Sequence, residues 1–133
     1  MSFDRKYLLW ALSYGVLGMG VGIYMAASHN HVQHVTHAHI LLVGFVVSLM
    51  YAVIHKLWLA ERPSRLATTQ FILHHAAAIT MFSGLGLLYG NVVAPQTLEP
   101  ILALSSIGVL VGIALMFVMV LRSRPAPVPN STR

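Results

Sequence analysis

The chain has 133 residues, of which 57% are hydrophobic and only 8% are charged. A soluble domain carries about 25% charged residues, so this composition predicts an integral membrane protein with room for one compact bundle. Cysteine is absent, which excludes disulfides, thiolate metal sites, cysteine nucleophiles and covalent c-type haem attachment. The formal net charge of +5 does not indicate nucleic-acid binding, because the basic residues flank the apolar segments.

Four apolar runs are each long enough to cross a bilayer, which takes about 20 helical residues. They cover about residues 7–27, 37–59, 68–90 and 98–121. The predicted fold class is therefore all-α, an integral membrane four-helix bundle. The N-terminus 1–6 is short, and the tail 122–133 is rich in proline, serine and arginine, which predicts disorder. An alternative for the first run is a cleaved signal peptide ending near Ser28, but the run exceeds the apolar core of about 7–15 residues that such peptides have.

The basic residues predict how the bundle is oriented. Lysine and arginine occur at the N-terminus, around the second connection and in the tail, and the first and third connections carry none. The positive-inside rule then places both termini in the cytoplasm and residues 28–36 and 91–97 on the outer face. We expect a multi-pass protein of the bacterial inner (plasma) membrane. Two small-residue patterns, Gly18-x-x-x-Gly22 and Gly108-x-x-x-Gly112, predict close packing between helices.

The first connection and the start of the second run hold five of the eight histidines: His29, His31, His34, His37 and His39. Neutral imidazole is a common ligand for haem iron and for other metals. An ionisable residue inside a membrane span is a functional candidate, because a charge there costs about 2.5–3.5 kcal/mol. We therefore expect His39 and His37 to bind a cofactor near the outer surface. The loop histidines His29, His31 and His34 are interpreted as solvated, with occasional metal capture as the alternative.

Helical geometry limits what the pair can do together. Residues two apart on a helix point about 200° apart, so His37 and His39 are not expected to hold one metal ion. They can instead serve two sites, or one can be a ligand while the other faces the surface. The first and fourth runs contain no histidine. A second axial ligand for His39 must then come from His37, from the loop or from another subunit, which favours an oligomer.

A second group of histidines lies on the inner side, at similar depths in the second and third runs: His55, His74 and His75. A bridge from His55 to His74 or His75 is geometrically possible. His37 and His55 are five full turns apart and should share a face, so a second, inner cofactor site is conceivable. The structural alternatives are that His55, beside Lys56, snorkels at the interface, and that His74 and His75 make hydrogen bonds inside the bundle.

The segment His37-Ala-His39-Ile-Leu-Leu-Val-Gly44-Phe45, which opens the second run, resembles the haem-ligating helices of the heme-copper oxidase and nitric-oxide reductase catalytic subunit. The chain from Tyr7 to Leu121 is also similar to small four-span proteins labelled oxidase-subunit-I-like. That likeness includes Tyr14-Gly-Val-Leu-Gly-Met-Gly-Val-Gly-Ile-Tyr-Met25 and Phe71-Ile-Leu-His74. Its specific part is the His-Ala-His segment.

This resemblance implies a fold, a cofactor and an assembly. In the family, pseudo-symmetric groups of four helices make up the large subunit, and the two members of a His-x-His pair serve different haems. One chain would equal one such group, and a closed ring of three copies would recreate the large subunit. The family's copper-ligand histidine pair and carboxylate proton channel have no counterpart here, since the acids are only Asp4, Glu61 and Glu99. Haem binding therefore carries over better than oxidase activity; the sequence leans against an enzyme and leaves an oxidoreductase role open.

The sequence thus predicts a membrane protein that binds b-type haem non-covalently through His39 or His37, as a homotrimer surrounded by lipid. Its expected role is electron transfer, or sensing of haem or a diatomic gas; no redox partner is indicated. The inner candidates for cofactor binding are His74, His55 and His75. One rival is a protein that handles copper or another divalent metal through His39, His37 and His34 with the rest of the loop. The other is a cofactor-free assembly subunit packed by its glycine faces.

Overall fold

The computed structural model describes residues 1–59 and 64–123, and these ranges are helical apart from short connections. The elements in chain order are α1 (Phe3–Ser28), α2 (His34–His39), the π-helix η1 (Ile40–Val46), α3 (Val47–Leu57), α4 (Arg65–Tyr89) and α5 (Pro95–Arg122). Because α2, η1 and α3 follow one another without a break, they form one long helix, His34–Leu57. This helix, α1, α4 and α5 are each long and apolar enough to cross a membrane. The all-α prediction with four apolar helices is confirmed.

Each of the four helices begins three or four residues before the apolar run that predicted it. The starts are residues 3, 34, 65 and 95, against predicted starts of 7, 37, 68 and 98. Polar first turns explain the difference. The Ser64 side chain caps α4 by accepting a hydrogen bond from the Ala67 N–H at 3.0 Å, and Pro95 occupies the first turn of α5, where its missing N–H costs nothing. A hydrophobicity pattern does not reveal polar first turns, so the helix starts predicted from it come a few residues too late. The predicted tail falls almost wholly on 124–133, outside the described residues.

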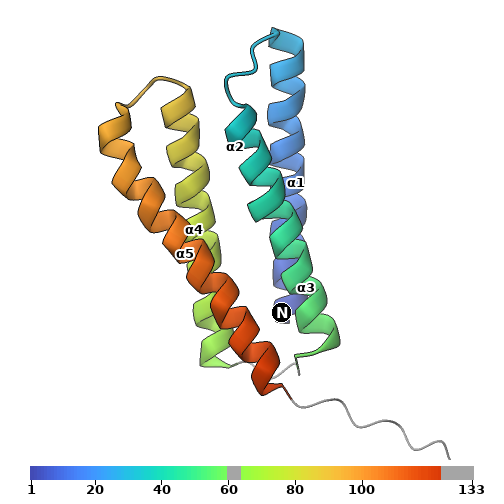
Figure 1. Ribbon diagram of the computed structural model, residues 1–133. Coiled ribbons are helices and arrows are strands. Elements are labelled where there is room, and N and C mark those ends of the chain that lie inside the picture. Colours follow the sequence, from blue (N-terminus) through green and yellow to red (C-terminus); the bar gives the residue numbers. More distant parts are fainter. Residues whose placement is uncertain (60–63, 124–133) are drawn as a thin grey trace, which may run out of the picture.

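The helices form two hairpins that stand side by side (Figure 1). In one, α1 packs along η1 and α3; in the other, α4 packs along α5, and α2 and η1 contact α4 between the hairpins. The start of α1, the end of α3, the start of α4 and the end of α5 lie together at one end (Figure 1). We call this the basic end, because the lysines and arginines of the described helices occur there: Arg5, Lys6, Lys56, Arg65 and Arg122.

Glycines allow the helices within each hairpin to approach closely. A Cβ atom on Gly18 would lie 2.5 Å from Cδ2 of Leu41, and one on Gly108 would lie 2.8 Å from Cβ of Ala77. Both distances are well below van der Waals contact, so a larger residue at either position would force its neighbour to move. The close packing predicted from the two small-residue patterns is confirmed at these positions.

Candidate functional site

His37 and His39, which we call the outer pair after the side predicted for them, lie on α2, at the end of the molecule opposite the basic end. Nδ1 of His37 lies 2.8 Å from the carbonyl oxygen of Gly18 in α1, and Nδ1 of His39 lies 2.8 Å from the carbonyl oxygen of Val35 in its own helix. A carbonyl oxygen can only accept a hydrogen bond, so each Nδ1 carries the proton and donates it. In the neutral imidazole the lone pair then resides on Nε2. Both side chains therefore present a nitrogen that can bind a metal or haem iron.

The glycine face of α1 shapes the position of His37. A Cβ atom on Gly22 would lie 2.9 Å from Cε1 of His37, so the imidazole occupies space that any other residue would fill. The helix changes to π-helical geometry directly after His39, over Ile40–Val46. Single π-helical turns are frequent at functional sites. The position of the His37 side chain thus depends on both α1 and α2, whereas the hydrogen bond of His39 is made within α2 alone.

The loop histidines are exposed, which agrees with their interpretation as solvated residues. His29, His31 and His34 are exposed, and Nδ1 of His34 donates to the carbonyl oxygen of His31 at 3.0 Å. His34 is nevertheless not a loop residue, since it begins α2, and the connection is shorter than the predicted 28–36. Across residues 1–59 and 64–123, no group of three or more His, Cys, Asp or Glu side chains comes together where a metal ion could be held. The metal site predicted from His39, His37 and His34 is therefore not assembled within one copy.

The inner histidines are buried. The exposed fraction is 0% for His74, 4% for His75 and 8% for His55. The Tyr14 hydroxyl and Nδ1 of His75 are hydrogen-bonded at 3.1 Å, and Oγ of Ser48 and Nε2 of His74 at 3.2 Å. These are the hydrogen bonds inside the bundle that the structural alternative predicted. The interpretation of His55 as a snorkelling residue is wrong, because its ring is stacked between Phe3 and Tyr7 rather than directed outward.

Tyr7 is the centre of the inner group and is completely buried. Its ring centroid lies 5.5 Å from that of His55, 5.4 Å from that of His75 and 6.4 Å from that of His74. Its hydroxyl donates to Oε1 of Gln70, whose amide nitrogen donates to the Gly112 carbonyl oxygen at 3.3 Å. Among the described residues no contact joins His55 directly to His74 or His75, so the bridge predicted between them stays a prediction; the Tyr7 ring is instead the neighbour that all three share.

Sequence reasoning singled out the histidines and missed the side chains that hold them. The missed residues are Tyr7, Tyr14, Ser48, Tyr51 and Gln70. A signal was present in the spacing of polar residues along apolar helices. Tyr7 and Tyr14 are seven residues apart, Gln70 and His74 are four apart, and Ser48, Tyr51 and His55 follow a three-and-four pattern. Each set lies on one helix face. A polar face inside an apolar helix predicts a buried network.

Four buried polar atoms of the inner group have no hydrogen-bond partner among the residues that the structure describes: Tyr51 Oη, His55 Nε2, His74 Nδ1 and His75 Nε2. Burying a polar group without a partner costs about 1–3 kcal/mol, so four such atoms in one cluster are a polar site rather than an ordinary apolar core. The rings of His74 and His75 lie 5.2 Å apart at 68° to one another. The imidazole planes of these two neighbouring residues of α4 are therefore steeply inclined to one another.

The molecule therefore has an outer pair of imidazoles with available Nε2 atoms and an inner cluster of buried imidazoles packed among tyrosines. Of these two groups, it is the outer pair that combines a fixed tautomer with partial exposure. No protein-family model, curated protein or solved structure matches the chain.

Proposed function

We propose that the chain binds b-type haem non-covalently, with Nε2 of His37 or His39 as an axial ligand to the iron. One observation carries the proposal. Each Nδ1–H is held by a main-chain carbonyl oxygen at 2.8 Å, and metal-binding histidines almost always donate their other N–H in this way. The absence of cysteine restricts the haem to a non-covalent type. With the basic end in the cytoplasm, as the positive-inside rule requires, this haem lies near the outer face.

The haem lies between copies of the chain in this proposal. Neither the cavity at the basic end nor the one along α4 and α5 is lined by His37 or His39. Both histidines are half-buried on the surface of one copy, so a second copy must cover the other face of the macrocycle. The helices α1 and α5 have no histidine to offer. A homotrimer, which the family resemblance implies, supplies the second axial ligand from a neighbour.

The ligand set determines the role. Two histidines would occupy both axial positions of the haem iron and favour electron transfer, whereas a single histidine would leave one axial position open for a diatomic gas. The protein's own contribution is to fix the tautomer and ring orientation of the axial imidazole and to surround it with apolar helices. The inner histidines are assigned a structural role here, because hydroxyl groups and aromatic rings already hold them.

Optical spectra of the purified protein, oxidised and dithionite-reduced, test the proposal. We expect the sharp reduced α and β bands of a six-coordinate b haem, lost or shifted in His37→Ala or His39→Ala and retained in His34→Ala. His34 is the matched control because it lies on the same helix and its Nδ1 also donates to a carbonyl oxygen, but it is exposed. His74→Ala should keep the bands. A protein that stays colourless after reconstitution with haem overturns the proposal, and copper binding that depends on the loop histidines would then support the metal-handling rival.

A further inference from the structure

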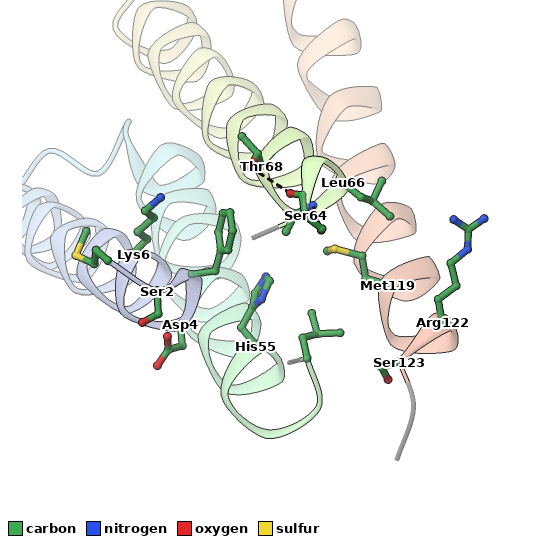
Figure 2. Close-up of a pocket in the computed structure, with 14 residues that line it drawn as sticks. Ser2, Asp4, Lys6, His55, Ser64, Leu66, Thr68, Met119, Arg122 and Ser123 are labelled. Carbon is green, nitrogen blue, oxygen red and sulfur yellow. Dashed lines mark hydrogen bonds between the residues drawn. The ribbon is translucent and has the colours of Figure 1, made fainter. Parts of the chain in front are cut away.

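The two hairpins are joined differently along their length. At the basic end, residues of both hairpins line a cavity of about 640 Å³, among them His55 of α3 and Met119 of α5 (Figure 2). Further along, side chains of α4 form hydrogen bonds with those of α1 and α3: Gln70 with Tyr7, His75 with Tyr14, and His74 with Ser48. Beyond these, within residues 1–59 and 64–123, one hydrogen bond joins the hairpins, from Gln33 to Gly86. A single side chain therefore ties the start of α2 to the second hairpin.

The chemistry of its partners fixes how the Gln33 amide is oriented. The Gly86 carbonyl oxygen can only accept, so Nε2 of Gln33 donates to it at 3.1 Å, and Oε1 accepts from the hydroxyl of the buried Thr36 at 2.7 Å. Gly86 lies in the last turn of α4. Its oxygen also accepts from the Gly90 N–H at 3.0 Å and keeps a second lone pair for Gln33. The negative end of the helix dipole favours a donor at this place.

One side-chain hydrogen bond to each hairpin thus holds the start of α2. Gln33 donates to Gly86 of α4, and Nδ1 of His37 donates to Gly18 of α1 at 2.8 Å. Gln33 and His37 are one turn apart, and the His37 N–H donates to the Gln33 carbonyl oxygen at 2.9 Å, so a movement of one carries the other. We propose that Gln33 is a positioning residue for His37, because it ties α2 to the end of α4 and so keeps the imidazole within reach of Gly18.

This position determines which imidazole nitrogen can act as a ligand. While Nδ1 of His37 donates to Gly18, the lone pair stays on Nε2. If α2 moves away from α4, that bond lengthens and the proton can transfer to Nε2, which removes the lone pair from the ligand position. His39 does not depend on Gln33 in this way, because its Nδ1 bonds to Val35 within α2. The effect on haem binding rests on the proposed function, whereas the position of His37 does not.

The haem-free protein tests the positioning directly. NMR spectra of the full chain with isotope-labelled histidine, in detergent micelles, report which nitrogen of each imidazole carries the proton. The signals are assigned by their absence from His37→Ala and His39→Ala. We expect Gln33→Leu and Gln33→Glu to shift His37 away from the Nδ1–H form, because neither side chain can donate to Gly86, and to leave His39 unchanged. Gln96→Leu and Gln96→Glu are matched controls at the same end, since Gln96 is exposed in the first turn of α5, and neither should change His37.

Three results would overturn the proposal. The first is an unchanged His37 signal in Gln33→Leu. The second is a change in Gln33→Leu that Gln33→Glu lacks, because Glu keeps an acceptor for Thr36 and the bond next to α2 would then be the important one. The third is an equal change at His39, which would mean that α2 has unfolded rather than moved.

Haem titration then measures the consequence for the proposed site. With His37 as the axial ligand, Gln33→Leu should weaken haem binding about 5-fold, the effect of losing one hydrogen bond, and Gln96→Leu should not. A parent chain that takes up no haem would refute the proposed haem site and leave the NMR result on Gln33 standing. The two proposals therefore fail separately.

Discussion

The two groups of histidines differ in the chemistry of their partners. On α2, His37 and His39 donate through Nδ1 to main-chain carbonyl oxygens, which can only accept, so the tautomer is fixed and Nε2 is available. On α4, the partners of His75 and His74 are the hydroxyls of Tyr14 in α1 and Ser48 in α3, which can donate or accept. These bonds stabilise packing without deciding which nitrogen keeps its lone pair. The same residue type thus has a fixed tautomer with an available Nε2 in one half of the molecule and an unfixed tautomer in the other, which is why we propose only the first pair as ligands.

The largest effect expected from this difference is on stability, in the inner half. Tyr7→Ala should lower the free energy of unfolding by about 3–5 kcal/mol, the range for deleting a buried aromatic ring, because Tyr7 contacts His55, His74 and His75 and is fully buried. Equilibrium unfolding in mixed detergent micelles measures the loss. Tyr24→Ala is the control on the same helix, since Tyr24 is 64% exposed, and it should change stability little. Similar losses for both variants would show that the Tyr7 cluster is no special source of stability.

An effect of intermediate size is expected in the outer half, on haem rather than on stability. Gly22→Ala would place a Cβ atom 2.9 Å from Cε1 of His37, so the ring must tilt and its bond to Gly18 must lengthen. Removing such a supporting contact weakens metal binding about 10-fold or more, which haem titration measures. Gly20→Ala is matched in residue type and helix, but a Cβ atom there meets nothing within 4 Å, so its haem affinity should be unchanged. If Gly22→Ala behaves in the same way, His39 rather than His37 is the axial ligand.

The sequence was sufficient for the four apolar helices and for placing the lysines and arginines of the described helices at one end, because hydrophobicity and charge act over whole segments. It could not reveal the partners of the histidines. The bond from His37 to Gly18 joins residues on different helices and ends on a main-chain oxygen, which is the same in every residue type. The π-helix at Ile40–Val46 was also hidden. It changes the number of residues per turn, yet His37 and His55 both contact α1, as the five-turn count predicted.

Burial of Tyr7 among three histidines was unpredictable for a different reason. Aromatic residues near a membrane interface are expected to form a belt facing the headgroups, and Tyr7 begins the first apolar run. Only its distance of seven residues from Tyr14 distinguishes it from a belt residue. Trp10, three residues further on, is partly exposed, yet its ring also stacks on His75 at a centroid distance of 4.6 Å. Single aromatic residues can therefore be assigned to the lipid or to the core only when the neighbouring helix is known.

The smallest effect tests whether the inner hydrogen bonds are merely structural. Tyr14→Phe removes the hydroxyl that is bonded to Nδ1 of His75 at 3.1 Å while keeping the ring, which packs on Phe82 at a centroid distance of 5.5 Å. Hydrogen bonds between membrane helices contribute about 0.6 kcal/mol on average, so the free energy of unfolding should fall by about that amount. The haem absorption bands should not shift, because the Tyr14–His75 bond belongs to the inner group, whose tautomers are not fixed and whose histidines are not proposed as axial ligands. A shifted spectrum in Tyr14→Phe, with Tyr24→Phe unchanged, would instead make His75 an axial ligand and reverse the roles assigned to the two halves.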